Sequence, residues 1–195
     1  MKVSAYQNAG EFIMKQHAKT RIMQHMTALL TQYPLDHITI KMICAHSDVH
    51  RTTFYDYFKD KYDLMDAIHL PHFKRYCRTV DYIKTHWVDF INEPEQCIRL
   101  FRMYFKYLKR HQQFYTAVLV TFPQKDIIED YIITTRNVYR HILVHNHDIA
   151  SPQHFVQYTI GGQLGLIYFW LREGCHNSPE MMAQTLYANL TRQHR

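Results

Sequence analysis

Apolar residues recur along most of this chain at intervals of three and four positions, the spacing of an α-helix that buries one face. The first such series is Ile22, Met26, Leu29 and Leu30. Pro34 predicts the end of this helix at Tyr33, because the residue before a proline is forced out of the helical region. No alternation of apolar and polar residues is long enough to indicate a strand. The pattern therefore predicts an all-α protein.

Proline, glycine and capping residues divide this pattern into separate helices. Pro71 lies inside a long helix that is expected to start at Lys61 or Tyr62, and it should bend or split that helix. Gly174 is expected to stop a later one. The other expected helices run from Glu11 or Lys19 to Tyr33, then over Ile40 to Ser47, His50 to Phe58, Pro94 to Arg110, Gln112 to Phe122, Pro123 to His145, Pro152 to Gly174 and Pro179 to Thr191.

Residues 38–64, ITIKMICAHSDVHRTTFYDYFKDKYDL, predict two short helices joined by a tight turn. Thr39 should cap the first helix, because its hydroxyl can accept a hydrogen bond from a free backbone N–H. The turn falls at Ser47, Asp48 and Val49, where Asp48 is expected to take the left-handed conformation that glycine usually fills. The residues expected to pack the pair together are Ile40, Ile43, Cys44, Val49, Phe54 and Phe58. This is a helix-turn-helix of the DNA-binding kind.

The second of these helices carries side chains suited to DNA, since a helix in the major groove presents its N-terminal residues to the bases. Arg51 is expected to hold guanine through two hydrogen bonds, and Thr52 and Thr53 suit thymine or phosphate. The ammonium of Lys61 and a helix N-terminus are expected to share one phosphate. The other candidate DNA-binding residues are Tyr55, Tyr57, Ile40 and Lys41. The alternative is a solvated surface for Arg51, Thr53 and Tyr55, and plain core packing for Phe54 and Phe58.

The same segment resembles the tetracycline-repressor (TetR) family of bacterial transcription regulators. The resemblance rests on the Thr-apolar start of the first helix, the V-x-R-x-T-[FL]-Y-x-[YH]-F core and the Lys after Phe58. It is strong over about residues 18–68, and Asp48 departs from the glycine that the family usually has. Beyond that, IGGQLGLIYFWLREGCHNSPEMMAQTL looks like the last two helices of some members. The resemblance implies a second domain that binds an inducer and respaces two DNA-reading heads.

We therefore expect a three-helix helix-turn-helix domain over residues 1–65, with residues 1–17 as an extension, and a helical effector-binding and dimerisation domain over residues 66–195. An apolar content of 47% fits a globular protein and excludes a disordered chain. The formal charge of +6 is compatible with a polyanionic partner. The four scattered cysteines indicate reduced thiols, and no export signal or membrane span is visible, so a cytoplasmic protein is expected.

The second domain carries many aromatic residues, which indicates a cavity for a planar or apolar small molecule. Ordinary packing between helices is the alternative explanation for any one of these residues. The candidate ligand-binding residues are Trp87, Phe101, Arg102, Tyr104, Phe105, His111, Tyr115, Tyr131 and Gln163.

Three of only five glycines, Gly161, Gly162 and Gly165, fall on one expected helix. Glycine is unfavourable inside a helix by about 1 kcal/mol, so the cluster indicates close approach of another backbone. The expected approach is between two copies of the chain, in a four-helix homodimer interface. The alternative is a tight crossing within one chain. The candidate interface residues are Gly161, Gly162, Gly165, Phe169, Met182 and Leu186.

Histidine pairs such as His141 with His145, and His69 with His72, have a spacing that suits zinc or nickel. No cysteine or carboxylate supports either pair, so no metal site and no cofactor is expected. No glycine-rich phosphate loop, GxSxG or HExxH motif is present, so an enzyme is not expected. The leading hypothesis is a dimeric transcription regulator, a repressor that a small ligand releases from a palindromic operator in double-stranded DNA. The alternative is a co-regulator that acts chiefly through a protein partner.

Overall fold

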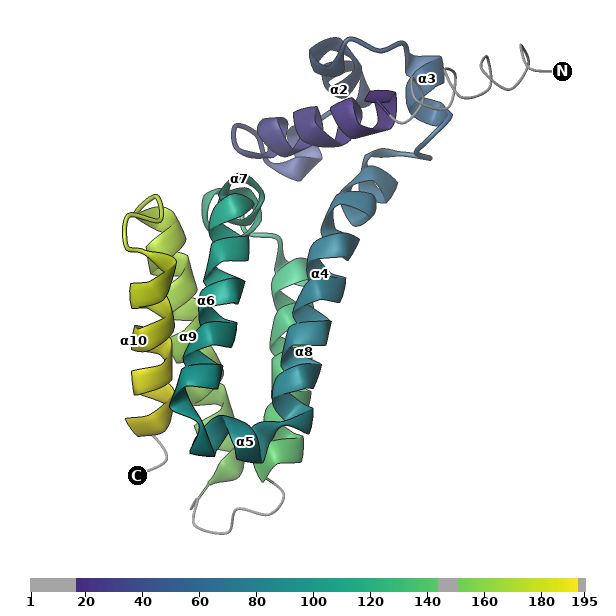
Figure 1. Cartoon of the computed structure of the whole chain (residues 1–195). Coiled ribbons are helices and arrows are strands. Elements are labelled where there is room, and N and C mark those ends of the chain that lie inside the picture. The colour runs from purple at the N-terminus through teal and green to yellow at the C-terminus, as the bar shows by residue number, and fades with distance from the viewer. Residues whose placement is uncertain (1–16, 144–150, 193–195) are drawn as a thin grey trace, which may run out of the picture. The chain divides into compact units, whose positions relative to one another are not determined.

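The computed structural model describes residues 17–143 and 151–192, and within them every regular element is a helix (Figure 1). The chain divides into two compact units, Met1–His72 and Phe73–Arg195, which we call the N-terminal and the C-terminal unit. The division falls inside helix α4, somewhat later than the boundary after residue 65 that the sequence suggests. No helix within the described ranges combines the length and the apolar character needed to cross a membrane.

The N-terminal unit contains a first helix over residues 17–30, the 3₁₀ turn η1 (Leu35–His37), α2 (Ile40–Ser47), α3 (Arg51–Tyr55) and the start of α4 (Lys61–Thr85). Its core is built from apolar side chains that are at most 2% exposed. These are Ile22, Met26, Leu29, Leu30, Ile38, Ile43, Phe54, Phe58 and Leu64. They come from each helix of the unit, so the helical spacing read from the sequence does mark the buried faces.

Several helix ends confirm the expectations from the sequence. The first helix gives way to a turn before Pro34. The hydroxyl of Thr39 accepts a hydrogen bond from the backbone N–H of Met42 at 3.2 Å. Asp48 follows α2 in the left-handed region, with φ 49° and ψ 54°. Gly174 ends α9 with φ 71°.

The second helix of the helix-turn-helix is shorter than expected. α3 spans Arg51–Tyr55 instead of His50 to Phe58. The N–H of Tyr57 donates to the carbonyl of Phe54 at 3.1 Å, a three-residue spacing that tightens the helix end into a turn. The sequence pattern cannot show this, because Phe58 is buried whether it lies in the helix or in the turn that follows.

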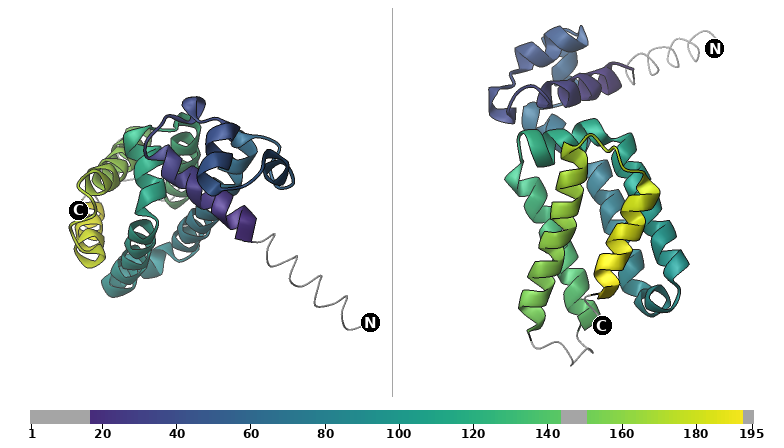
Figure 2. Two further views of the ribbon diagram at one scale, coloured as in Figure 1. Left: turned by 90° about the horizontal axis from the view of Figure 1, so that it is seen from above. Right: turned by 90° about the vertical axis from the view of Figure 1, so that its left-hand side faces the viewer.

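The C-terminal unit is a bundle whose longer helices run along roughly one direction (Figures 1 and 2). After the second half of α4 it contains α5 (Trp87–Asn92), α6 (Pro94–Arg110), α7 (Gln112–Thr116), the π-helical turn η2 (Ala117–Thr121), α8 (Lys125–Leu143), α9 (Pro152–Arg172) and α10 (Pro179–Arg192). α10 packs against α6, and α8 packs against α9. The ring of Phe105 meets that of Trp170 edge-on at 5.2 Å, and this pair joins α6 to α9.

Three details differ from the sequence-based expectation. Pro71 does not split α4, which continues through it to Thr85. The short helix α5 was not expected. The helix after Gln112 ends as a π-turn, in which the N–H of Phe122 donates to the carbonyl of Ala117 at 3.0 Å, one residue wider than an α-helical bond.

Candidate nucleic-acid interface and internal cavity

α3 exposes most of the side chains that are expected to read DNA and buries one core residue. Arg51 and Thr52 are exposed, Thr53 is half-buried, and Tyr55 is 51% exposed. Phe54 is fully buried and meets the ring of Tyr55 edge-on at 5.5 Å. The buried ring anchors the helix, which leaves an arginine, a threonine and a phenol free to meet an outside partner.

The other expected DNA contacts lie outside α3. Lys41 is exposed at the start of α2, beside the half-buried Ile40. Tyr57 is half-buried, with its ring 6.3 Å from that of Phe58. Lys41 is thus the expected phosphate contact with the most accessible charge, while Ile40 and Tyr57 also serve the packing of the unit.

Lys61 has a structural role in place of the expected phosphate contact. Its Nζ donates hydrogen bonds to the carbonyl oxygens of Leu35 at 2.8 Å, Asp36 at 3.0 Å and Ile38 at 3.0 Å. An ammonium group has three N–H donors, so all of them serve the carbonyls at the end of η1. The carbonyl of Leu35 also accepts from the backbone N–H of Ile38 at 3.1 Å, and the lysine adds the remaining hydrogen bonds at this end of the turn.

The N-terminus of α4 is also occupied. Oδ1 of Asp60 accepts hydrogen bonds from the backbone N–H groups of Tyr62 at 2.8 Å and Asp63 at 2.9 Å. The carboxylate of Asp63 accepts in turn from the N–H of Lys59 at 2.9 Å. This reciprocal capping uses the backbone donors that the sequence analysis assigned to a phosphate.

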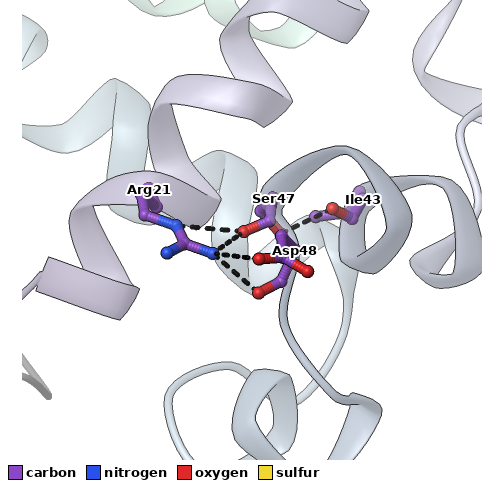
Figure 3. Close-up of polar contacts among 4 residues, drawn as sticks. All are labelled: Arg21, Ile43, Ser47 and Asp48. Carbon is purple, nitrogen blue, oxygen red and sulfur yellow. Dashed lines mark hydrogen bonds and ion pairs between the residues drawn. The ribbon is translucent and has the colours of Figure 1, made fainter.

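An arginine from the first helix supports the turn of the helix-turn-helix (Figure 3). Nε of Arg21 donates to the carbonyl of Ser47 at 3.0 Å, and Nη2 donates to the same carbonyl and to that of Asp48 at 2.6 Å. The Asp48 carboxylate lies 3.6 Å from the guanidinium. The hydroxyl of Ser47 donates to the carbonyl of Ile43 at 2.6 Å. Arg21 therefore caps the carbonyl end of α2 at the residue whose backbone is left-handed.

Sequence reasoning missed Arg21, because its partners are backbone carbonyls more than twenty residues away. The only sequence signal is Asp48 itself. A non-glycine residue is strained in the left-handed region, and this departure from glycine indicates that compensating contacts are present.

We predict that Arg21→Ala destabilises the protein by about 1 kcal/mol, because charge-assisted hydrogen bonds to carbonyls are lost at a half-exposed site. Asp48→Gly should raise stability slightly, since it relieves the left-handed strain, keeps the backbone carbonyls and loses only an exposed ion pair. Denaturant unfolding of both variants measures the two effects. A loss from Asp48→Gly equal to that from Arg21→Ala would show that the carboxylate, not the carbonyls, carries the interaction.

The C-terminal unit encloses a cavity of about 750 Å³, within the range of small-molecule sites. Its walls come from α4, α5, α6, α7, α8, α9 and α10, with Leu119 from η2. Six of the nine residues expected from the sequence are in these walls, namely Trp87, Phe101, Tyr104, Tyr115, Tyr131 and Gln163.

The other three expected ligand contacts lie outside the walls and have other partners. Nη1 of Arg102 donates to the carboxylate of Glu180 at 2.8 Å, which ties α6 to α10. Phe105 is fully buried in the core. His111 follows the end of α6, and its ring lies tilted against that of Tyr107, with ring centroids 4.5 Å apart. Residue type had suggested all three, but residue type does not show which side chains of a helix face the cavity.

A cluster of hydroxyl groups lies at one part of the cavity wall. Tyr76 and Thr135 are hydrogen bonded through their hydroxyls. The ring of Tyr76 is 4.7 Å from that of Tyr131 and 6.1 Å from that of Tyr104. Burial raises the pKa of Tyr76 to about 12, and it also raises the pKa of Tyr104 and Tyr131. These hydroxyls are therefore neutral donors and acceptors at physiological pH.

Tyr76, Thr135 and Tyr139 were missed as cavity residues in the sequence analysis. A signal for two of them exists, because Tyr131, Thr135 and Tyr139 are spaced four residues apart and so share one face of α8. The hydroxyl of Tyr139 accepts a hydrogen bond from the side-chain amide of Gln163. Tyr76 has no comparable signal, since it lies on a different helix.

The three clustered glycines lie on an open face of α9. A Cβ added at Gly161, Gly162 or Gly165 would meet no other atom within 4 Å. A tight crossing within the chain, the alternative considered above, therefore does not explain them. Phe169 is on the same face and is 59% exposed.

The two expected interface residues of α10 are on its inner side. Met182 is 3% exposed and Leu186 is 8% exposed, and Leu186 also lines the cavity. Met181 is 52% exposed instead. Neighbouring residues of a helix point about 100° apart. The sequence shows that Met181 and Met182 are both apolar, but it does not show which of them faces outward. The prediction of Met182 therefore names a residue on the inner face of α10.

Among the described residues, no three of His, Cys, Asp or Glu come together in a way that could hold a metal ion. His69 and His72 are buried in α4, and His141 is exposed near the end of α8. His145, the expected partner of His141, lies outside the described residues.

Known proteins match both units of the chain. Residues 22–68 match the model for bacterial regulatory proteins of the tetR family, and residues 95–192 match the model for a transcriptional regulator C-terminal region. No protein of curated function gives a significant match.

Three solved structures share the fold. NalD, the secondary repressor of the MexAB-OprM multidrug efflux pump in Pseudomonas aeruginosa, gives a TM-score of 0.65 at 13% identity over 92% of this chain and 97% of its own. The dihydroxyacetone kinase operon activator DhaS gives 0.58 at 18%, over 90% and 95%. FadR from Bacillus subtilis, solved with stearoyl-CoA, gives 0.55 at 12%, over 87% and 95%.

At these identities the structures show a common fold and nothing finer. The two family models carry the assignment, because one covers the helix-turn-helix and the other covers most of the C-terminal unit. The chain is thus a transcriptional regulator and not an enzyme, and it belongs to the tetR family of bacterial regulatory proteins.

Proposed function

We propose that this protein is a repressor that binds a palindromic operator as a homodimer and leaves it when a small molecule enters the C-terminal cavity. The DNA-binding part of the proposal rests on the exposed surface of α3. Arg51, Thr52 and Tyr55 are exposed on this helix, while Phe54 is buried. A protein that acted only through a protein partner would have no need of this set. Since a bacterial operator lies in the cytoplasm, the proposal places the protein there.

The homodimer is supported by one exposed face of α9. Tyr158, Gly161, Gly162, Gly165 and Phe169 follow the spacing of a single helical face. Tyr158 is 71% exposed and Phe169 is 59% exposed, and the glycines between them have open space beside their Cα atoms. Exposed apolar rings that flank small residues suit the close approach of a second helix. Two-fold symmetry would also match a palindromic site.

Release by a ligand is supported by the size of the cavity and by its walls, which include residues from every long helix of the C-terminal unit. A ligand that prefers one arrangement of these helices shifts the population toward it. FadR from Bacillus subtilis has the same fold and was solved with stearoyl-CoA, which supports a small-molecule effector. The same fold also serves an operon activator, DhaS, so a reporter gene behind the selected operator tests the sign of regulation.

Selection of bound sequences from a random pool of double-stranded DNA, with the full-length protein, tests the proposal. We expect enrichment of a palindrome whose half-sites are one or more helical turns apart, about 34–36 Å per turn. Enrichment of an asymmetric single site would contradict the symmetric dimer. No enrichment over heparin-like competitors would contradict DNA reading altogether and would favour the protein-partner alternative.

A further inference from the structure

The walls of the cavity carry no formal charge. Among the described residues that line it, none is Asp, Glu, Lys, Arg or His. An ionised ligand group buried here would lose its hydration and gain no opposite charge in return.

Three cations of the surrounding helices have partners outside the cavity. The guanidinium of Arg102 pairs with Glu180 at 2.8 Å, and Nζ of Lys109 donates to the carbonyl of Cys175 at 2.9 Å. The guanidinium of Arg75 lies over the ring of Tyr107, 4.4 Å from its centre. None of these three cations lines the cavity, so an anionic ligand would find no counter-ion in its walls.

Hydroxyl groups gather along the first half of α8, where Tyr131 and Thr135 are joined by Tyr76 from α4. In the second half the wall is formed by Val138, Ile142 and Tyr139, and the Tyr139 hydroxyl already accepts a hydrogen bond from the Gln163 amide. Lining residues extend from Ile128 to Leu143, so this wall is about 22 Å long at 1.5 Å per residue. The cavity therefore suits an elongated molecule with a polar group at one end.

We infer that the effector is an uncharged amphiphile, with an elongated apolar body and one hydroxyl, carbonyl or ester group that bonds to the Tyr76, Tyr131 and Thr135 hydroxyls. This inference rests on the proposed function, since it names the ligand class of the same cavity. An uncharged ligand would distinguish this protein from regulators whose cavity binds a ligand with an anionic head group.

Four probes test the ligand class, three of which share one alkyl chain. They are 1-decanol, decanoate, decyltrimethylammonium and stearoyl-CoA, each at a free concentration below micelle formation. We expect 1-decanol to raise the melting temperature of the full-length protein and to release it from the selected operator. The three charged probes should give no comparable shift. Equal or stronger stabilisation by decanoate, the ammonium or stearoyl-CoA would overturn the inference, as would the absence of any shift with 1-decanol.

Operator binding without any probe is measured in the same experiment. If the operator is bound but 1-decanol has no effect, the ligand class fails while the DNA-binding function stands. If the operator is not bound at all, the proposed function fails whatever the probes do.

A double variant locates the polar end of the ligand. Tyr76→Phe with Thr135→Val removes both hydroxyls of one hydrogen bond while it keeps a ring and a branched side chain, so the fold should survive. We expect about fivefold to tenfold weaker binding of 1-decanol. Thr85→Val is the matched control, because its hydroxyl bonds to the carbonyl of Asp81 outside the cavity. Unchanged binding of 1-decanol by the double variant would overturn the assignment of these hydroxyls.

Discussion

Arg51→Ala is expected to weaken binding to the selected operator far more than binding to random DNA. Arg51 is exposed at the first position of α3, the part of a recognition helix that meets base edges. A bidentate arginine–guanine contact contributes about 1–3 kcal/mol to discrimination. A palindrome uses this contact twice, so the loss on the operator should be about 2–6 kcal/mol. Binding to random duplexes should fall only through the lost charge.

Fluorescence anisotropy with operator and scrambled duplexes, at several salt concentrations, measures this difference. Arg110→Ala, an exposed arginine at the end of α6, changes the net charge equally and should leave the operator preference intact. Lys41→Ala should weaken both duplexes alike, as expected for a phosphate contact. If Arg51→Ala also weakens both alike, Arg51 holds a phosphate and the bases are read by other residues.

Gly165→Leu is expected to convert the dimer into monomers and to abolish tight operator binding. The structure leaves open space around this glycine, so a side chain is accommodated in the single chain. The change should even favour the helix by about 1 kcal/mol. In a dimer that packs through α9, the same side chain would separate the two backbones. Loss of the second half-site contact then removes most of the affinity.

Light scattering and sedimentation at micromolar concentration report the oligomeric state, and thermal unfolding reports whether the variant is folded. Gln153→Leu is the matched control, because it is exposed on α9 and is rotated by about 120° from Gly165. A Gly165→Leu variant that remains a dimer and binds the operator normally would place the interface on another surface. A wild-type monomer would remove the dimer from the proposal.

Local chemistry explains why parts of this fold could be predicted from the sequence. Pro34, Thr39 and Gly174 act on the backbone within a few residues of themselves, so their effects do not depend on distant partners. Asp48 is left-handed as expected, because the turn between α2 and α3 imposes that conformation on whichever residue occupies it. The helix-turn-helix over residues 38–64 could be predicted for the same reason, because its motif is contiguous in the sequence.

The sequence by itself determined the all-helical class, the ends of most helices, the exposed face of α3 and the presence of an aromatic cavity in the C-terminal unit. Only the tertiary structure decided that Lys61 serves backbone carbonyls, that Arg21 supports the turn and that Met182 faces inward. It also brought Tyr76 to Thr135 and left Arg102 outside the cavity. The physical reason is distance along the chain. Periodicity shows which residues share a face of one helix, but the partner of that face is set by how separate helices pack together.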